Sequence, residues 1–165
     1  MGKNENLIRI FEYALSQERA AKGFFEDSMR RMAASTAKKA FGRLAEEEDR
    51  HIDMINRILI GLRGGPDLQK VDAKPPKMGK TKFLDKREKT QFLEQCTAGS
   101  GLIDVGIFNT AYLFEKDIAE FYGAMAEKTE GESRKALLML ARWEEGHAEF
   151  FKEFKDRLTQ VFARF

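Results

Sequence analysis

The apolar residues of this 165-residue chain recur at steps of three and four along four long stretches. That spacing places them on one face of an α-helix, and it is typical of the buried seam of a helical bundle. It predicts helices at about residues 5–32, 37–62, 103–129 and 133–162. Below, the seam means the positions of each helix that follow this spacing and face the axis of the bundle.

The connections between the stretches predict how the helices are arranged. The first and last breaks are short, so each should join two helices into an antiparallel hairpin. Residues 63–102 form a much longer connection that holds all three prolines and many lysines, with a short helix expected around Lys86 to Gln95. A long crossover between two hairpins is typical of ferritin-like bundles. We therefore expect one all-α domain over residues 1–165, a ferritin-like four-helix bundle of two antiparallel helical hairpins.

Charged and imidazole side chains interrupt the seam at six positions where packing favours an apolar residue. The segments "LAEEEDRHIDMI" and "LARWEEGHAEFF" each contain the motif E-x-x-H within the seam, and the other two helices each contribute one seam glutamate. The six residues are Glu18, Glu48, His51, Glu115, Glu144 and His147.

The two halves of the chain also resemble each other. Aligning "ALSQERAAKGFF" with "AYLFEKDIAEFY" places Glu18 on Glu115. Aligning the two E-x-x-H segments superimposes their glutamates and their histidines, and the two alignments differ in offset by a single residue, which a loop can absorb. The chain is therefore predicted to be an internal repeat of two helical hairpins.

The chemistry of the six residues favours a metal site. Residues three apart share a helical face, so each E-x-x-H directs both side chains to one point. Four buried carboxylates would repel one another strongly unless they are neutralised, and the nearby Arg19, Arg50 and Arg142 lie off the seam. Two divalent cations would neutralise them, and imidazole completes a ligand set suited to iron or manganese, with zinc also accepted. The same constellation defines the di-iron and di-manganese carboxylate bundles.

A structural interpretation has to be weighed beside this one. A single E-x-x-H is usually a solvated helix face, and a lone buried histidine is usually a core residue. Here the only two histidines of the chain both occur in this motif, at equivalent positions of the repeat, which favours the metal site. The neighbouring acids are expected on the surface; they are Glu46, Glu47, Asp49, Glu120, Glu145 and Glu149.

Two aromatic residues near the predicted site are assigned mainly to packing. Tyr122 lies seven residues after Glu115. It could be a hydrogen-bond or electron relay beside the site, but core packing is favoured because its counterpart in the first helix is Phe25. Trp143 directly precedes Glu144 and is expected to pack facing away from it.

Composition excludes several other classes of function. A formal net charge of +2 gives no argument for binding nucleic acid. The single cysteine, Cys96, excludes a disulfide framework and a paired C-x-x-C iron site, and it fits a reducing compartment. No apolar run is long enough to span a bilayer, and the N-terminus lacks the apolar core of a signal peptide. We expect a cytoplasmic protein without membrane or nucleic-acid partners.

The motifs "ERAAKGFF", "EEEDRH", "EKDIAEFY" and "WEEGH" resemble those of the rubrerythrin branch of the ferritin-like superfamily, across all four helices. The resemblance implies that the six seam residues are the ligands of two metal ions. Glu48 and Glu144 would bridge both metals, Glu18 and Glu115 would each be terminal ligands to one, and the two histidines would complete the coordination. Members of that branch use such centres to reduce peroxide or to react with dioxygen.

The chain departs from rubrerythrins at two points. Ile118 stands where they carry an additional glutamate that takes part in a redox-dependent ligand shift, and this chain has no rubredoxin-like C-x-x-C pairs. The resemblance therefore predicts a non-haem di-iron oxidoreductase of the peroxidase or oxidase type that needs an external electron donor, in a homodimer or larger homo-oligomer. The alternatives are oxidation and storage of ferrous iron in a ferritin-like oligomer, and a metal-free scaffold.

Overall fold

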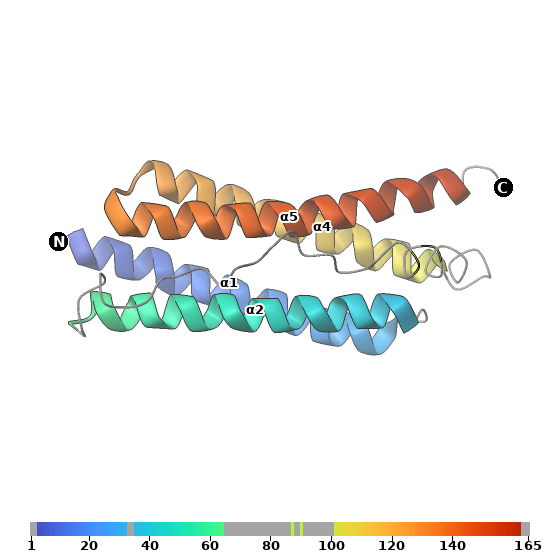
Figure 1. Ribbon diagram of the computed structural model, residues 1–165, viewed down its shortest axis with the longest axis horizontal. Helices are drawn as coiled ribbons and strands as arrows, with labels where there is room; N and C mark the ends of the chain where they lie inside the picture. The colour runs from blue at the N-terminus through green and yellow to red at the C-terminus, as the bar shows by residue number, and fades with distance from the viewer. Residues whose placement is uncertain (1–2, 33–34, 65–86, 88–89, 91–100, 163–165) are drawn as a thin grey trace.

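The computed structural model describes residues 3–32, 35–64, 87, 90 and 101–162 (Figure 1). In that part of the chain the secondary structure is helical and no strand occurs. The long helices are α1 (Lys3–Arg31), α2 (Ser35–Leu62), α4 (Gly101–Glu127) and α5 (Gly131–Phe162). All four predicted helices are confirmed, with ends that differ from the expected ones by at most two residues. Of the short helix expected around Lys86 to Gln95, Arg87 and Thr90 are helical and the rest lies outside the described residues.

The helices form two antiparallel hairpins, α1 with α2 and α4 with α5, which lie against each other to make a four-helix bundle (Figure 1). α1 and α5 run in one direction along the bundle, and α2 and α4 run in the other. α2 ends and α4 begins at opposite ends of the bundle, so the connection between the hairpins is a long crossover, as predicted. This is the connectivity of ferritin-like folds.

Glycines in the left-handed region of backbone conformation occur where helices end. α2 finishes with backbone hydrogen bonds from Arg63 N to Leu59 O and from Gly64 N to Gly61 O, and Gly64 has a φ of 96°. Gly131, at the turn between α4 and α5, has a φ of 66°. Side chains with a Cβ rarely adopt these values, so glycine allows the chain to leave one helix and turn.

Four phenylalanines, one from each helix, make a buried layer next to the seam glutamates. Each lies seven residues, or two helical turns, from the seam glutamate of its own helix, and so on the same helical face. Because the helices alternate in direction, all four rings meet on the same side of the glutamates, with contacting ring centroids 5.4–5.9 Å apart. The layer is Phe25, Phe41, Phe108 and Phe151.

None of the described helices carries an apolar stretch long enough to cross a bilayer.

Candidate metal centre

The structure brings all six predicted residues together in the middle of the bundle. The four glutamates come from four different helices and are fully buried, and the two histidines are 0% and 2% exposed. Their potential ligand atoms form two overlapping groups of four, and within each group the atoms lie within 4.8 Å of one another. Glu48 and Glu144 belong to both groups. The cluster is therefore compact enough to hold metal, with two glutamates in a central position.

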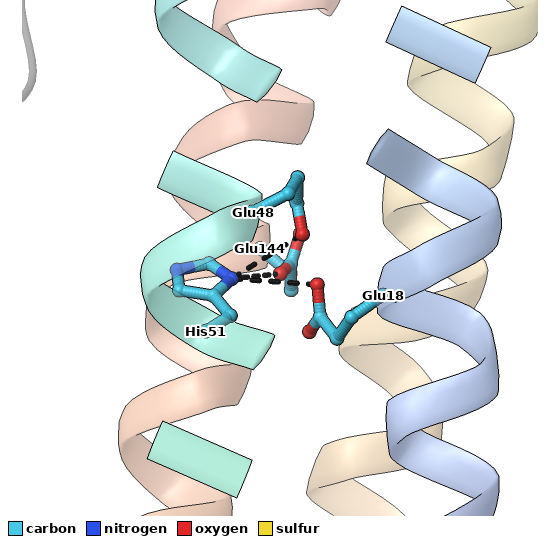
Figure 2. A group of neighbouring side chains, drawn as sticks. All are labelled: Glu18, Glu48, His51 and Glu144. Carbon is cyan, nitrogen blue, oxygen red and sulfur yellow. Dashed lines mark hydrogen bonds and ion pairs between the residues drawn. The ribbon is translucent and has the colours of Figure 1, made fainter. Parts of the chain in front are cut away.

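The first group surrounds His51 (Figure 2). Its Nδ1 atom lies 2.9 Å from Glu144 Oε1, 3.4 Å from Glu48 Oε2 and 3.4 Å from Glu18 Oε2. Glu18 belongs to α1, so three helices contribute side chains to this group. One histidine nitrogen thus faces carboxylate oxygens from α1, α2 and α5.

The second group surrounds His147 in the same way. Its Nδ1 atom lies 3.4 Å from Glu48 Oε1, 3.4 Å from Glu144 Oε2 and 3.7 Å from Glu115 Oε2. The two shared glutamates therefore direct one oxygen to each histidine. The two imidazole rings are nearly parallel, with centroids 5.9 Å apart and an interplanar angle of 13°.

The carboxylates of the cluster fit a cation because their oxygens are otherwise unsatisfied. Both oxygens of Glu48, Glu115 and Glu144 are buried and have no hydrogen-bond partner among the described residues. Burying such groups without a partner is costly. Arg19, Arg50 and Arg142, which were predicted to lie off the seam, are exposed. Carboxylate oxygens combined with imidazole nitrogens are a ligand set for divalent transition metals, so the donor set fits such ions.

Two of the four carboxyl groups favour the protonated form when no metal is present. Burial, together with the nearby charges of Glu144 and Glu48, raises the pKa of Glu18 and of Glu115 well above the ordinary value. A proton on these two groups relieves the repulsion within the cluster.

The other two glutamates stay ionised and hold protons on the histidines. Although burial opposes it, interactions with the neighbouring carboxyl groups and the two histidines lower the pKa of Glu48 and hold the pKa of Glu144 well below its ordinary value. Burial also opposes protonation of His51 and His147, but the surrounding carboxylates raise the pKa of both well above the ordinary value. A metal that binds here has to displace protons from the cluster.

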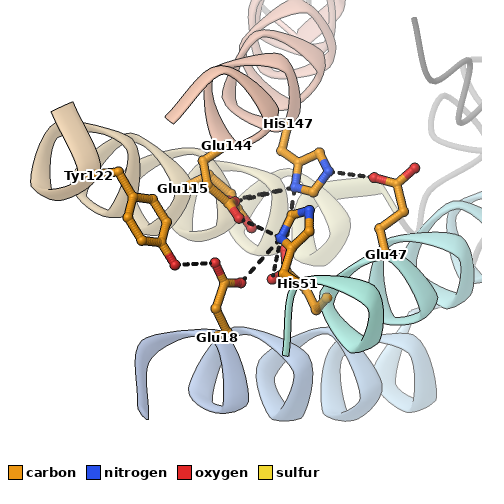
Figure 3. A network of polar contacts seen from close by, with 8 residues as sticks. Glu18, Glu47, His51, Glu115, Tyr122, Glu144 and His147 are labelled. Atoms are coloured by element: carbon orange, nitrogen blue, oxygen red, sulfur yellow. Dashed lines mark hydrogen bonds and ion pairs between the residues drawn. The ribbon is translucent and has the colours of Figure 1, made fainter. Parts of the chain in front are cut away.

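Tyr122 does more than pack in the core. Its side chain is fully buried, and its hydroxyl donates a hydrogen bond of 2.5 Å to Glu18 Oε1 (Figure 3). Burial and the charge of Glu18 raise the pKa of the phenol well above its ordinary value, so Tyr122 keeps its proton. Of the two roles considered from the sequence, the hydrogen-bond contact with the site is therefore present together with core packing.

The prediction that Glu47 lies on the surface is wrong. Glu47 is 3% exposed, and its Oε2 atom lies 2.6 Å from His147 Nε2, on the side of the ring away from the cluster (Figure 3). It directly precedes a seam residue, so it flanks the seam and is covered by the packing of α2 against the other hairpin. The residues that directly precede Glu115 and Glu144 are the aromatic Phe114 and Trp143. These aromatic residues were the feature of the sequence that could have indicated that Glu47, at the equivalent position, is buried.

Trp143 packs against the core, as predicted, but it also contacts a residue of the cluster. Its ring is stacked on His51, with centroids 4.8 Å apart and an interplanar angle of 8°. Trp143 directly precedes Glu144 on α5, so it too flanks the seam and reaches the histidine of α2.

The five remaining acids of the group expected on the surface are exposed; they are Glu46, Asp49, Glu120, Glu145 and Glu149.

Comparisons with known proteins find no family model, no curated protein and no solved structure that matches this chain. Its chemistry has to be inferred from the residues themselves. They form a buried cluster of four carboxylates and two imidazoles that could hold metal.

Proposed function

We propose that the chain is a non-haem di-iron protein of the rubrerythrin type that reduces peroxide or dioxygen. One observation carries the proposal: Glu48 and Glu144 each direct one oxygen to His51 Nδ1 and the other to His147 Nδ1. A carboxylate placed in this way can bind two cations at once, one through each oxygen. Two cations with a double positive charge would neutralise the four carboxylates of the cluster.

The remaining ligands divide between two metal positions. Position A would be held by Glu18 and His51, and position B by Glu115 and His147. Both share the two bridging glutamates. Each position would then offer three oxygen ligands and one nitrogen ligand, and a metal that prefers five or six ligands could also bind a small substrate.

When bound, two ferrous ions supply one electron each, and with two protons these reduce one hydrogen peroxide to two waters. The chain supplies the surroundings of that reaction. Tyr122 holds its hydroxyl proton against Glu18 at the edge of position A. The layer of four phenylalanines covers one side of the cluster with apolar rings and excludes water there.

Ile118 and the single cysteine limit the reactions that the proposed centre can carry out. Ile118 is 4% exposed and offers no ligand, so a shift of the metal to an additional glutamate at this position is excluded. One cysteine cannot form a rubredoxin-type iron site within this chain. We therefore propose that an external reductant returns the electrons.

The test is to load the metal-free protein anaerobically with ferrous iron, measure bound iron per chain, and follow oxidation after adding peroxide. The proposal expects two irons per chain and one peroxide consumed for each pair. Glu144→Ala should abolish the fast oxidation, whereas Glu145→Ala, which changes the adjacent exposed acid, should leave it unchanged. Oxidation of equal rate in wild type and Glu144→Ala would overturn the proposal. Uptake far beyond two irons per chain, in a large oligomer, would favour iron storage instead.

A further inference from the structure

The two halves of the repeat differ at one pair of equivalent positions beside the cluster. The alignment that superimposes the two E-x-x-H segments also places Glu47 on Trp143. Each of these side chains contacts the histidine of the other hairpin: Glu47 contacts His147, and Trp143 contacts His51. The repeat therefore puts a charged acceptor against one imidazole and an aromatic ring against the other.

The contact with Glu47 determines which ring nitrogen of His147 is available to bind a metal. Its Nε2 atom lies 2.6 Å from Glu47 Oε2, and both side chains are nearly inaccessible to solvent. With Nε2 donating to Glu47, Nδ1 is the nitrogen that faces the cluster and would bind a metal. A carboxylate that accepts this bond also increases electron donation from the imidazole to a metal.

His51 has no such support. Its Nε2 atom is buried and has no hydrogen-bond partner among the described residues. Stacking on Trp143 holds the plane of the ring, but a neutral indole ring adds no negative charge behind it. His51 is therefore the weaker donor of the two imidazoles.

Glu18 and Glu115, which would each bind one metal only, also differ in electron donation, and Glu115 at position B is the stronger donor. Glu18 accepts the hydrogen bond of Tyr122, which draws electron density away from its carboxylate. Glu115, its equivalent in the repeat, has two buried oxygens without a hydrogen-bond partner in the described part of the chain. The residue that the repeat places opposite Tyr122 is Phe25, which has no hydroxyl. Figure 3 shows the two differences at opposite ends of the network, with Tyr122 at one end and Glu47 at the other.

We infer that the two metal positions are unequal: position B, with Glu115 and His147, binds a divalent cation first and more tightly than position A. Glu47 is the positioning residue that creates much of this difference. The inference rests on the proposed di-metal centre and adds to it an order of filling and the residue responsible. It concerns affinity, so it can be tested without turnover.

The experiment is a titration of the metal-free protein with Co²⁺, followed by visible absorption and by calorimetry. Repulsion between two cations would by itself separate two binding steps, so the steps have to be assigned. Glu115→Ala removes a ligand that only position B uses, and it should eliminate the tighter step. Glu18→Ala removes a ligand of position A alone, and it should eliminate the weaker step.

The substitution Glu47→Gln then tests the role of Glu47, because it keeps the size of the side chain and removes its charge. The tighter step should weaken by about 10- to 100-fold, the usual effect of losing a partner behind a metal-bound histidine, and the weaker step should change by less than about threefold. Glu46→Gln, at the adjacent exposed position, is the matched control and should change neither step. A merely structural role for Glu47 would weaken both steps together.

A measurement on the unaltered chain keeps the test independent of how the variants fold. With ¹⁵N-labelled histidine and Zn²⁺ bound, the two imidazoles give two sets of signals, because the chain has only two histidines. One Nε2–H, that of His147, should be strongly hydrogen-bonded and slow to exchange, and the other should not.

The outcomes separate the two proposals. If Co²⁺ does not bind, the di-metal centre itself fails. If two Co²⁺ ions bind but Glu47→Gln weakens both steps equally or neither, or if the tighter step belongs to position A, the inference is overturned and the di-metal centre stands. Equivalent signals from the two histidines in the zinc-loaded wild type would also overturn it.

Discussion

Glu48 of α2 and Glu144 of α5 share the same two partners, since each directs one carboxylate oxygen to His51 and the other to His147 at 2.9–3.4 Å. The other two glutamates of the cluster each face a single histidine. The internal repeat accounts for this arrangement, because Glu48 and Glu144 are equivalent residues of the two hairpins. Two shared and two unshared carboxylates are therefore a property of the repeat itself.

The first prediction concerns metal content. Glu144→Ala should lower bound divalent metal from about two ions per chain to well below one, because both positions lose an oxygen ligand. Glu18→Ala should retain about one ion, since it affects one position. The measurement is elemental analysis after loading and dialysis, with Glu145→Ala as the control that stays at the wild-type value. Two ions retained by Glu144→Ala would contradict the shared role of this glutamate.

The second prediction concerns the stability of the metal-free protein. The pKa values of Glu18, Glu115, His51 and His147 are raised in the folded state. A group whose folded pKa is raised contributes stability in full below its unfolded pKa and loses it as pH rises through the folded pKa. Their ordinary values are 4.5 for glutamate and 6.5 for histidine. The free energy of unfolding should therefore fall as pH rises above these ordinary values, first through the glutamates above 4.5 and then through the histidines above 6.5.

Thermal unfolding in the presence of a chelator tests whether stability falls as pH rises. Glu48 and Glu144 have lowered pKa values, so they act in the opposite sense and their stabilising contribution is lost as pH falls below their ordinary value of 4.5. The metal-free protein should thus be most stable in mildly acidic solution. The increase in Tm on adding Zn²⁺ should grow with pH, because bound metal replaces protons. A metal-free Tm that rises as pH increases above 6.5, the ordinary value of histidine, would show that these four groups do not carry extra protons in the folded state.

The third prediction isolates the hydrogen bond between Tyr122 and Glu18. Tyr122→Phe keeps the buried ring and removes the hydroxyl, so it should destabilise the protein by about 0.5–1.5 kcal/mol. Tyr13→Phe is the matched control, because Tyr13 is 51% exposed, and it should change stability by less than about 0.5 kcal/mol. Denaturant unfolding at neutral pH measures both. Equal effects of the two substitutions would indicate that the Tyr122 hydroxyl contributes nothing to stability.

The fourth prediction tests the phenylalanine layer. Phe41 is fully buried, and its ring contacts those of Phe25, Phe108 and Phe151. Phe41→Ala should cost about 3–5 kcal/mol through the lost burial and the cavity that remains. Leu113→Ala, at a residue that is 50% exposed, should cost less than about 0.5 kcal/mol. A loss below about 1 kcal/mol for Phe41→Ala would mean that the neighbouring rings collapse into the space.

Much of the fold could be predicted from the spacing of apolar residues. Steps of three and four leave one helical face to be buried, and the breaks between the stretches leave few ways to pair the helices. The same rule predicted the six seam residues, as polar side chains on helical faces that are otherwise apolar. All six are buried together.

The residues behind the cluster could not be assigned in this way. Glu47 and Trp143 lie one residue before a seam position, and such a residue points about 100° away from the seam. Whether that direction meets solvent or another helix depends on how closely the hairpins pack. In this bundle the packing buries Glu47, partly buries Trp143 and brings each to the histidine of the other hairpin.

The sequence by itself determined four helices, their pairing and six inward-facing residues, because helical periodicity decides which side chains share a face. The tertiary structure decided that Tyr122 bonds to Glu18, that Glu47 supports His147 and that Trp143 covers His51. These contacts join residues far apart in the chain, and their geometry depends on the distance and rotation between helices, which periodicity leaves open.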